Sequence, residues 1–279
     1  MVSKVSEYMS SPVVAIAPGE SLARARNLML RYKINRVVVE DRGRPLGVLT
    51  STDLVRAMLN PSLSRKAFDE IPAKAVMSSP VITVSEKTDV RYAARLMLKN
   101  NVGTLPVVDQ EGKLVGIFTR TDAVKAYADG EGEVKQVIEV ADRSPPTVSP
   151  FHSIYRVLEA MEEKPYHKVV VIEGRKPLGV IAKRDVLFLN LRSFTSGPSY
   201  LKRETPLEKG RTGGLRIYLI PLAIDLMSES VITALLDEDT RNASRRMIEK
   251  GVGCLPIVKG EELVGLFTKH DVLRLLVAS

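Results

Sequence analysis

Apolar and polar residues follow the same order four times along the chain. A short β-branched run, such as Val-Ile-Thr-Val at 81–84, comes first. Apolar residues then recur every three or four positions, which predicts a helix with one buried face. In the first copy they are Leu22, Ala25, Leu28, Met29 and Tyr32. Two apolar runs separated by a polar turn follow, as at 105–108 and 114–118, and a second helical pattern ends the copy. The pattern predicts a β-α-β-β-α unit and an α/β fold.

Each copy ends in a motif whose glycine lies six residues before an aspartate. The four pairs are Gly47 and Asp53, Gly116 and Asp122, Gly179 and Asp185, and Gly265 and Asp271. A methionine precedes each glycine by eighteen or nineteen residues, namely Met29, Met97, Met161 and Met247. This agreement predicts an internal repeat. Because one such unit buries too little apolar surface alone, neighbouring units must stack.

Composition narrows the class of protein. The chain has 279 residues, with 41 Lys and Arg against 33 Asp and Glu, and a net charge of +8. This charge suits an anionic ligand, but it is too interleaved with acidic residues to indicate nucleic-acid binding. Cys254 is the one cysteine, which excludes an intrachain disulfide framework and a cysteine metal site. No apolar run is long enough to span a bilayer. We therefore expect a soluble, cytoplasmic protein without a membrane segment.

Three sequence motifs resemble the CBS (cystathionine-β-synthase) domain. They are the Ser-Ser-Pro-Val-Ile-Thr opening at 78–83, the Gly-Thr-Leu-Pro-Val middle at 103–107 and the Gly-x-x-Thr-x-x-Asp close. CBS domains pair into Bateman modules, and two modules in one chain resemble the nucleotide-binding gamma subunit of AMP-activated protein kinase. The resemblance implies four repeats in two modules that form a disc with pseudo-twofold symmetry. The implied repeats lie at about 5–60, 73–129, 137–191 and 223–279, the modules at 1–136 and 137–279, and an inserted loop at 192–222.

The resemblance also implies adenine-nucleotide ligands such as AMP, ADP or ATP, and no cofactor or metal beyond them. In the family the closing aspartate binds the ribose diol, and the threonine before it bonds ribose or phosphate oxygens. These roles fall on Asp53, Asp122, Asp185 and Asp271, and on Thr50, Thr119 and Thr268. The third repeat has Ala182 at the threonine position, so we expect the weakest site there, with Lys183 and Arg184 offsetting the loss in part. A structural alternative is a capping box, in which Thr and Asp satisfy the first N–H groups of a helix.

Further ligand contacts are implied on the opening strands. The ligand-facing position of the family holds Thr83, Thr147 and Thr233, whereas the first repeat has Ala15. Apolar neighbours could sandwich an adenine ring. They are Val13, Val81, Ile82, Val231 and Ile232. Threonine is also a common strand former, and the apolar residues could be ordinary core, so both structural alternatives stay open.

Basic residues before the second strand are implied phosphate ligands. The first and third repeats carry Arg36, His167 and Lys168 there, where the other two repeats have Gly-Thr and Gly-Cys. Arg120 and Lys269, next to the closing threonines, are further candidates. The alternative is solvated surface charge, which is the usual state of Lys and Arg.

The sequence has no catalytic motif: it lacks a Gly-x-x-x-x-Gly-Lys phosphate loop, a His-Glu-x-x-His pair and a Gly-x-Ser-x-Gly elbow. We therefore predict a regulatory protein, not an enzyme, that senses adenine nucleotides and acts on a separate partner protein; a homodimer is one form it could take. Two alternatives stay open. One is a ligand-free scaffold for protein association. The other is a nucleic-acid-associated factor that uses the basic loop at 192–216, which holds Lys202, Arg203, Lys209 and Arg211.

Overall fold

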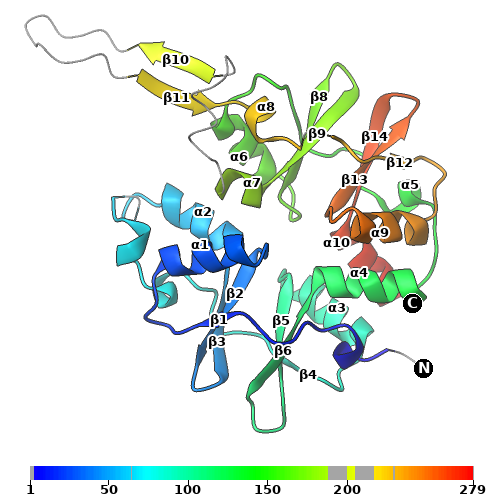
Figure 1. Cartoon of the computed structure of the whole chain (residues 1–279). Coiled ribbons are helices and arrows are strands. Elements are labelled where there is room, and N and C mark those ends of the chain that lie inside the picture. Colours follow the sequence, from blue (N-terminus) through cyan, green and yellow to red (C-terminus); the bar gives the residue numbers. More distant parts are fainter. Residues whose placement is uncertain (1–2, 64, 188–199, 205–216, 229, 279) are drawn as a thin grey trace, which may run out of the picture. The chain divides into compact units, whose positions relative to one another are not determined.

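The β-α-β-β-α unit expected from the sequence occurs four times in the computed structural model (Figure 1). The structure describes residues 3–63, 65–187, 200–204, 217–228 and 230–278. Two compact units divide the chain. Unit 1 holds Met1–Arg143, Thr233–Val258 and Val264–Ser279, and unit 2 holds Ser144–Ile232 and Lys259–Leu263. Unit 1 therefore contains the first two repeats and most of the fourth, whereas unit 2 contains the third.

The first two repeats each form a three-stranded sheet with two helices. The first repeat consists of β1 (Ala15–Ile16), α1 (Leu22–Arg31), β2 (Arg36–Asp41), β3 (Arg44–Thr50) and α2 (Ser51–Leu59). The second consists of β4 (Val84–Ser85), α3 (Val90–Lys99), β5 (Thr104–Val108), β6 (Leu114–Thr119) and α4 (Arg120–Asp129). In both sheets the first strand is parallel to the second, and the second is antiparallel to the third. Parallel neighbours need a crossover connection, which α1 and α3 provide.

The third and fourth repeats have the same order of elements. The third consists of β7 (Thr147–Val148), α6 (Ile154–Glu162), β8 (Lys168–Glu173), β9 (Lys176–Ala182) and α7 (Lys183–Leu187). The fourth consists of β12 (Ala234–Leu235), α9 (Thr240–Glu249), β13 (Cys254–Lys259), β14 (Glu262–Thr268) and α10 (Lys269–Ala278). Their strand orders are β7-β8-β9 and β12-β13-β14. The α/β class and the fourfold repeat are confirmed, while the pairing into two modules and the disc stay predictions.

Aliphatic side chains fill the interior of each repeat. The four methionines of the repeat pattern lie on the first helix of each copy and are 0% exposed: Met29, Met97, Met161 and Met247. Phe118 and Phe267, on the third strands of the second and fourth repeats, are also fully buried. With so few aromatic residues in the chain, methionine and aliphatic side chains supply most of the apolar area that is removed from water.

Helices of the second and fourth repeats pack against each other within unit 1. The contacting pairs are α3 with α10, α4 with α9 and α4 with α10 (Figure 1). Arg241 of α9 donates to the carbonyl oxygens of Tyr127, Gly130 and Gly132, at 3.2, 3.1 and 3.0 Å, where α4 ends. Gly130 and Gly132 follow the last residue of α4, and Tyr127 O also accepts from Gly130 N at 3.2 Å. The guanidinium therefore adds hydrogen bonds at this C-terminus, where a cation interacts favourably with the helix dipole. The Tyr127 hydroxyl also bonds Thr240 Oγ1, at 2.5 Å.

A short leader precedes each repeat and lies against a different repeat. The helical turns of the leaders are η1 (Val5–Glu7), η3 (Ala73–Ala75), α5 (Val137–Val140) and α8 (Ala223–Leu226); a further turn, η2 (Phe68–Glu70), follows α2. The backbone N–H of Val5 donates to Thr88 O of the second repeat at 2.8 Å, and that of Ala73 donates to Glu20 O of the first at 2.7 Å. The first two repeats therefore exchange their leaders. The third and fourth repeats do the same. The backbone N–H of Val137 donates to Glu238 O of the fourth repeat at 2.9 Å, and that of Ala223 donates to His152 O of the third at 2.8 Å.

The closing glycine makes room for an exchanged leader. A Cβ on Gly47 would lie 2.6 Å from Met77 Sδ and 2.8 Å from Ser78 O, both in the leader of the second repeat. Met9, in the leader of the first repeat, lies against Gly116 in the same way. Since real Cβ atoms do not approach other atoms this closely, the glycine of the motif is required for packing.

The region expected to be an inserted loop at 192–222 contains a hairpin. Strands β10 (Tyr200–Glu204) and β11 (Ile217–Pro221) pair antiparallel, so this part of the expected loop is corrected to β structure. The reason lies in the Ile-Tyr-Leu-Ile run at 217–220, which is rich in residues that favour strands. The basic residues Lys209 and Arg211 lie outside the described residues. Among the helices of the described part of the chain, none has the length and apolar character of a membrane-crossing segment.

Candidate functional site

The closing Thr and Asp form a capping box at the start of a helix. Thr50 N and Oγ1 donate to Asp53 Oδ2, at 2.8 and 2.6 Å, and Asp53 N donates back to Thr50 Oγ1 at 3.3 Å. The two bonds to the carboxylate recur between Thr119 and Asp122, at 2.9 and 2.7 Å, and between Thr268 and Asp271, at 2.8 and 2.7 Å. The structural alternative is therefore present in these three repeats. It occupies one carboxylate oxygen of each aspartate and leaves the other for further contacts.

Cations already contact that second oxygen in two repeats. Asp122 Oδ1 accepts from Lys125 Nζ at 3.2 Å, and Asp271 Oδ1 accepts from Arg274. Burial raises the pKa of Asp271, although the hydrogen bonds from Thr268 and Arg274 oppose this. A ribose diol that bound either aspartate would share an oxygen with a local cation or displace it.

The third repeat keeps the aspartate and lacks the hydroxyl. Ala182 N donates to Asp185 Oδ2 at 2.7 Å, so the backbone half of the cap survives. Lys183 is buried and pairs with Glu162 of α6 at 2.5 Å, and Arg184 pairs with Asp185 at 3.4 Å. Both cations that were expected to offset the missing hydroxyl are thus held by carboxylates of unit 2.

Two arginines from different repeats meet around Gly103 in unit 1. Arg36, the first residue of β2, donates to Gly103 O and Thr104 Oγ1 of the second repeat. Arg120, the first residue of α4, donates to Val102 O at 3.4 Å, while its buried Nε has no hydrogen-bond partner among the described residues. Burial lowers the pKa of Arg36 to about 10, and the charge of Arg120 adds to this effect while Asp122 opposes it. Two like charges are thus held close together, an arrangement that an anion would stabilise.

The start of α10 brings two more basic side chains to this place. Lys269 Nζ donates to Thr121 Oγ1 of α4 at 2.8 Å. His270 Nδ1 is buried and has no hydrogen-bond partner in the described part of the chain. Burial, followed by the positive charges of Arg120 and Arg274, lowers the pKa of His270 to about 4. We call Arg36, Arg120, Lys269 and His270 the basic cluster.

The basic cluster has the chemistry of an anion site. Three repeats contribute to it, and it lies where α4 and α10, which pack against each other, both begin. Helix N-termini carry free N–H groups and a partial positive charge, so they favour phosphate. Buried polar atoms without partners are uncommon in proteins, and here two nitrogens of this kind, Arg120 Nε and His270 Nδ1, lie in one basic environment.

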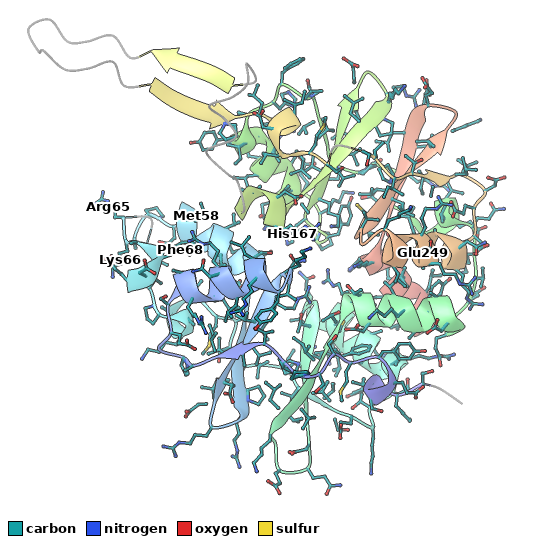
Figure 2. The ribbon with its side chains drawn as sticks, viewed as in Figure 1. Met58, Arg65, Lys66, Phe68, His167 and Glu249 are labelled. Atoms are coloured by element: carbon teal, nitrogen blue, oxygen red, sulfur yellow. The ribbon has the colours of Figure 1, made fainter. Side chains whose placement is uncertain are left out.

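The other two implied phosphate ligands lie in unit 2. His167 has a positive φ of 48° and bonds Met161 O through Nδ1 at 3.1 Å, which places its ring at the end of α6 (Figure 2). Lys168 begins β8 and is partly buried. The structure therefore brings Arg36, Arg120 and Lys269 together, and it places His167 and Lys168 in a different unit.

The opening segments are less regular than the sequence suggests. Thr147 lies in β7, whereas Thr83 and Thr233 directly precede the two-residue strands β4 and β12. Thr83 is exposed, and Thr233 O accepts from Arg246 at 2.7 Å. The apolar residues proposed to contact adenine are partly buried, so they are not ordinary core: Val13, Val81, Ile82, Val231 and Ile232.

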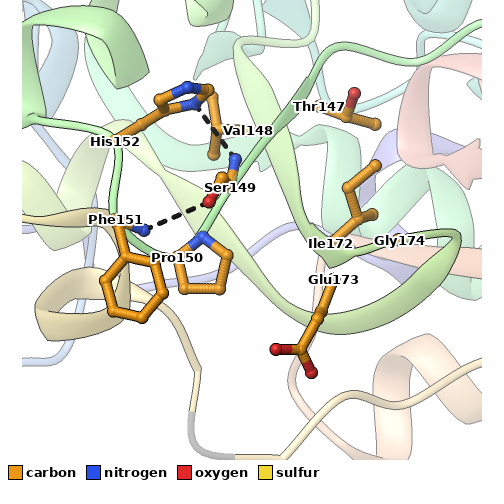
Figure 3. Close-up of a pocket in the computed structure, with 9 residues that line it drawn as sticks. All are labelled: Thr147, Val148, Ser149, Pro150, Phe151, His152, Ile172, Glu173 and Gly174. Carbon is orange, nitrogen blue, oxygen red and sulfur yellow. Dashed lines mark hydrogen bonds between the residues drawn. The ribbon is translucent and has the colours of Figure 1, made fainter.

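A cavity of about 370 Å³ lies at the other end of β7 and β8 from Lys168 (Figure 3). Its walls include Thr147, Phe151 and Glu173. His152 at its rim accepts from Ser149 N through Nδ1, at 3.0 Å. In the equivalent turn of the first repeat, Glu20 accepts from Ala17 N at 2.8 Å, so His152 has the same turn-closing role as Glu20.

Sequence reasoning missed His270. The motif places it between Lys269 and Asp271, where the other repeats have Thr52, Thr121 and Arg184. A histidine where the other copies have hydroxyl or guanidinium groups is a visible signal. Its meaning depends on Arg120, which is 150 residues earlier in the chain.

Comparison with known proteins places the whole chain in one family. The sequence profile of the CBS domain matches residues 5–60, 73–129, 134–191 and 223–278. The chain belongs to the CBS domain family. Its four CBS repeats correspond to the four β-α-β-β-α units, and the resemblance seen in the sequence motifs is confirmed.

Proteins from other organisms resemble this chain over nearly its full length. The MJ1225 protein of Methanocaldococcus jannaschii is 24% identical over 287 residues, which cover 98% of each chain. A 33.4 kDa protein from the ribosomal RNA operon of Thermofilum pendens is 26% identical over 282 residues, which cover 95% of this chain and 88% of the relative. The crystal structure of MJ1225, described as a proposed archaeal homologue of γ-AMPK, superimposes with a TM-score of 0.77 at 22% identity, over 98% of this chain and 99% of that one. This likeness shows a common fold.

Proposed function

We propose that this CBS protein reversibly binds an adenine nucleotide, AMP, ADP or ATP, and that occupancy regulates a separate partner protein. The observation that carries the proposal is the basic cluster, in which Arg120 and His270 each have a buried nitrogen without a hydrogen-bond partner among the described residues. A phosphate would accept from these nitrogens and neutralise the like charges around it.

The roles of the remaining residues follow from their places. Arg36 and Lys269 supply positive charge to the phosphate, together with the N–H groups at the starts of α4 and α10. Asp122 and Asp271 offer the ribose a carboxylate oxygen each, at the same helix starts. In the first repeat Asp53 plays this part beside Thr50. In unit 2, the carboxylate of Asp185 is the proposed acceptor for the ribose. Lys168 and His167 are the proposed phosphate ligands there.

A regulatory role is supported by how the site is built. Residues from three repeats form the basic cluster, and the helices that carry Arg120 and Lys269 also pack against each other. A ligand that draws these side chains together would change the junction between repeats, and a partner that prefers one arrangement would respond. The likeness to MJ1225, a proposed archaeal homologue of γ-AMPK, supports a partner on a separate chain.

Titration calorimetry of the full chain with AMP, ADP, ATP and adenosine tests the proposal. We expect saturable binding of the nucleotides, with adenosine much weaker because it offers the basic cluster no phosphate. The matched variants are Arg120→Ala in the cluster and Arg24→Ala at an exposed position of α1. Saturable binding that Arg120→Ala weakens and Arg24→Ala leaves unchanged would support the proposal. No heat with any nucleotide, and no shift in melting temperature, would leave a scaffold without ligand as the better description.

A further inference from the structure

His270 is the residue of the basic cluster whose side chain ordinarily titrates near neutral pH. The other three members are Arg and Lys, which stay charged under ordinary conditions. His270 is the second residue of α10 and bonds Thr268 Oγ1 through its backbone N–H, at 3.2 Å, so the helix cap fixes its position. Its Nδ1 is buried without a hydrogen-bond partner in the described residues. A ring held in this way can gain a partner when an anion arrives.

The charged groups on the helices around His270 are mainly positive. Its own helix, α10, also carries Lys269, Asp271 and Arg274, and α4, which packs against α10, carries Arg120, Asp122, Lys125 and Asp129. The carboxylates are engaged locally, because Asp271 accepts from Thr268 and Arg274, and Asp122 accepts from Thr119 and Lys125. The other helices packed on α10 are α3, with Arg91, Arg95 and Lys99, and α9, with Arg241, Arg245, Arg246 and Glu249.

The electrostatic effects on His270 come from the nearest of these groups. After burial, the causes that lower its pKa are the charges of Arg120 and Arg274. An imidazolium would therefore add one more positive charge to a place that already holds several, and His270 is neutral at pH 7 in this form of the protein. A dianion bound against Arg120 reverses the balance, since it attracts a proton to His270 and accepts its N–H.

We infer that His270 binds the anion in its protonated form, so that each phosphate bound at the basic cluster brings a proton with it. The inference rests on the proposed function, and it adds a regulation that the function does not require: the contribution of His270 to nucleotide affinity rises as the solution becomes more acidic. The proton leaves again when the nucleotide dissociates, so no covalent step is involved. Occupancy then depends on pH as well as on nucleotide concentration.

The sign of the effect follows from linkage. A group that is neutral in the free protein and charged in the complex takes up a proton on binding, so affinity increases as pH falls between the two pKa values of that group. For one such group the dissociation constant changes by up to about tenfold per pH unit in that range. The AMP phosphate itself titrates at a pH of about 6 and loses a charge as the pH falls, which opposes the trend. The contribution of His270 must therefore be isolated by substitution.

The test is calorimetry of the full chain with AMP at pH 6.0, 7.0 and 8.0, each in two buffers that differ in ionisation enthalpy. The difference in heat between buffers gives the protons taken up per AMP. We expect the parent protein to take up at least about 0.3 proton more than His270→Gln at pH 6.0 to 7.0, because the phosphate contribution is common to both. His270→Arg, which stays charged, should bind AMP with no extra proton uptake. His152→Gln in unit 2 is the control and should match the parent.

The outcomes separate the two claims. Heat that saturates, with equal proton uptake in the parent, His270→Gln and His270→Arg, would overturn the inference and leave the proposed function standing. No heat in the parent and in His270→Arg would overturn both. A melting curve of each variant establishes that it is folded, and His270→Arg remains informative where His270→Gln is not. Proton uptake that disappears in both His270 variants supports the inference.

Discussion

At the scale of single residues, the basic cluster holds like charges close together. Arg36 and Arg120 flank Gly103, and a Cβ there would lie 3.6 Å from Arg36 Nη1 and 3.4 Å from Arg120 Nε. The hydrogen bonds of Arg36 to the second repeat offset part of the repulsion between the two guanidinium groups. Arg120 makes one long bond of 3.4 Å and leaves Nε unpaired among the described residues, so it contributes little to the fold in this form.

Replacing Arg120 by alanine therefore separates binding from stability. We expect AMP affinity to fall by roughly ten- to a hundredfold, because a hydrogen bond to a charged group contributes about 1.5–3 kcal/mol. The melting temperature of the free protein should stay within a few degrees of the parent or rise, since repulsion with Arg36 is removed. Calorimetry and thermal unfolding measure the two effects. A large loss of stability with unchanged affinity would show that Arg120 serves the fold.

His270 also makes a prediction for the protein without ligand. Its pKa is lowered to about 4 from the ordinary 6.5, so the unfolded chain takes up this proton first as the pH falls. The folded state should lose stability through His270 between pH 6.5 and pH 4. The ring is partly solvent-accessible, which reduces the effect, so we expect the free energy of unfolding to fall by roughly 1–2 kcal/mol.

Denaturant unfolding of the parent and of His270→Gln between pH 6.5 and pH 4 measures this loss of stability. The raised pKa of Asp271 acts with the opposite sign, and it cancels because both proteins contain it. The parent should lose stability relative to the variant as the pH falls. Parallel curves for the two proteins would count against a neutral, partly buried ring.

At the scale of elements, the exchanged leaders explain why a glycine stands in the third strand of each repeat. A Cβ on Gly179 would lie 2.8 Å from Ser228 O and 2.9 Å from Met227 Cβ, both in the leader of the fourth repeat, just as a Cβ on Gly47 would clash with the leader of the second repeat. Gly265 is more tolerant, with Asp142 O at 3.1 Å. The glycine of the closing motif therefore indicates that the leader of another repeat packs closely on the third strand.

Gly47→Ala should destabilise the protein strongly, by about 2–4 kcal/mol, because backbone and a partly buried methionine must both move. Gly19→Ala is the matched control, since a Cβ there meets nothing within 4 Å. It should be neutral or slightly stabilising, because alanine restricts the unfolded chain more than glycine does. Chemical denaturation compares the two. Equal stability of both variants would show that the leader can withdraw from the strand at little cost.

The sequence could predict these elements because their signals are local. Alternating runs, helical spacing and the Thr-x-x-Asp close identify each β-α-β-β-α unit. The hairpin of β10 and β11 was missed because Ser-Gly-Pro at 196–198 and Gly-Gly at 213–214 favour a loop. His270 was missed for a different reason: its environment is made by Arg120 from another repeat, and only the packing of α4 on α10 brings them together.

At the scale of the whole molecule, the contacts within unit 1 connect the second and fourth repeats more closely than the expected module boundary suggests. Arg241 holds the end of α4 through three carbonyl oxygens, and Arg245 donates to Ala128 O at 3.0 Å. Tyr127 is 0% exposed within this packing. The apolar surface of α3 and α4 is therefore covered by helices that lie far along the chain.

A fragment of residues 1–136 tests how much the helices of the fourth repeat stabilise the first two repeats. It contains the first two repeats with their exchanged leaders, but it lacks α9 and α10. Loss of these helices exposes apolar surface around Tyr127, and each 100 Å² of such surface corresponds to about 2.5 kcal/mol of lost burial. We expect the fragment to self-associate through this surface, because exposed apolar patches of this kind drive association. Analytical ultracentrifugation should show dimers or larger species, which Tyr127→Glu in the fragment should reduce. A monomeric fragment that melts like the full chain would mean that the first two repeats form an independent body, and that the helices of the fourth repeat add little to their stability.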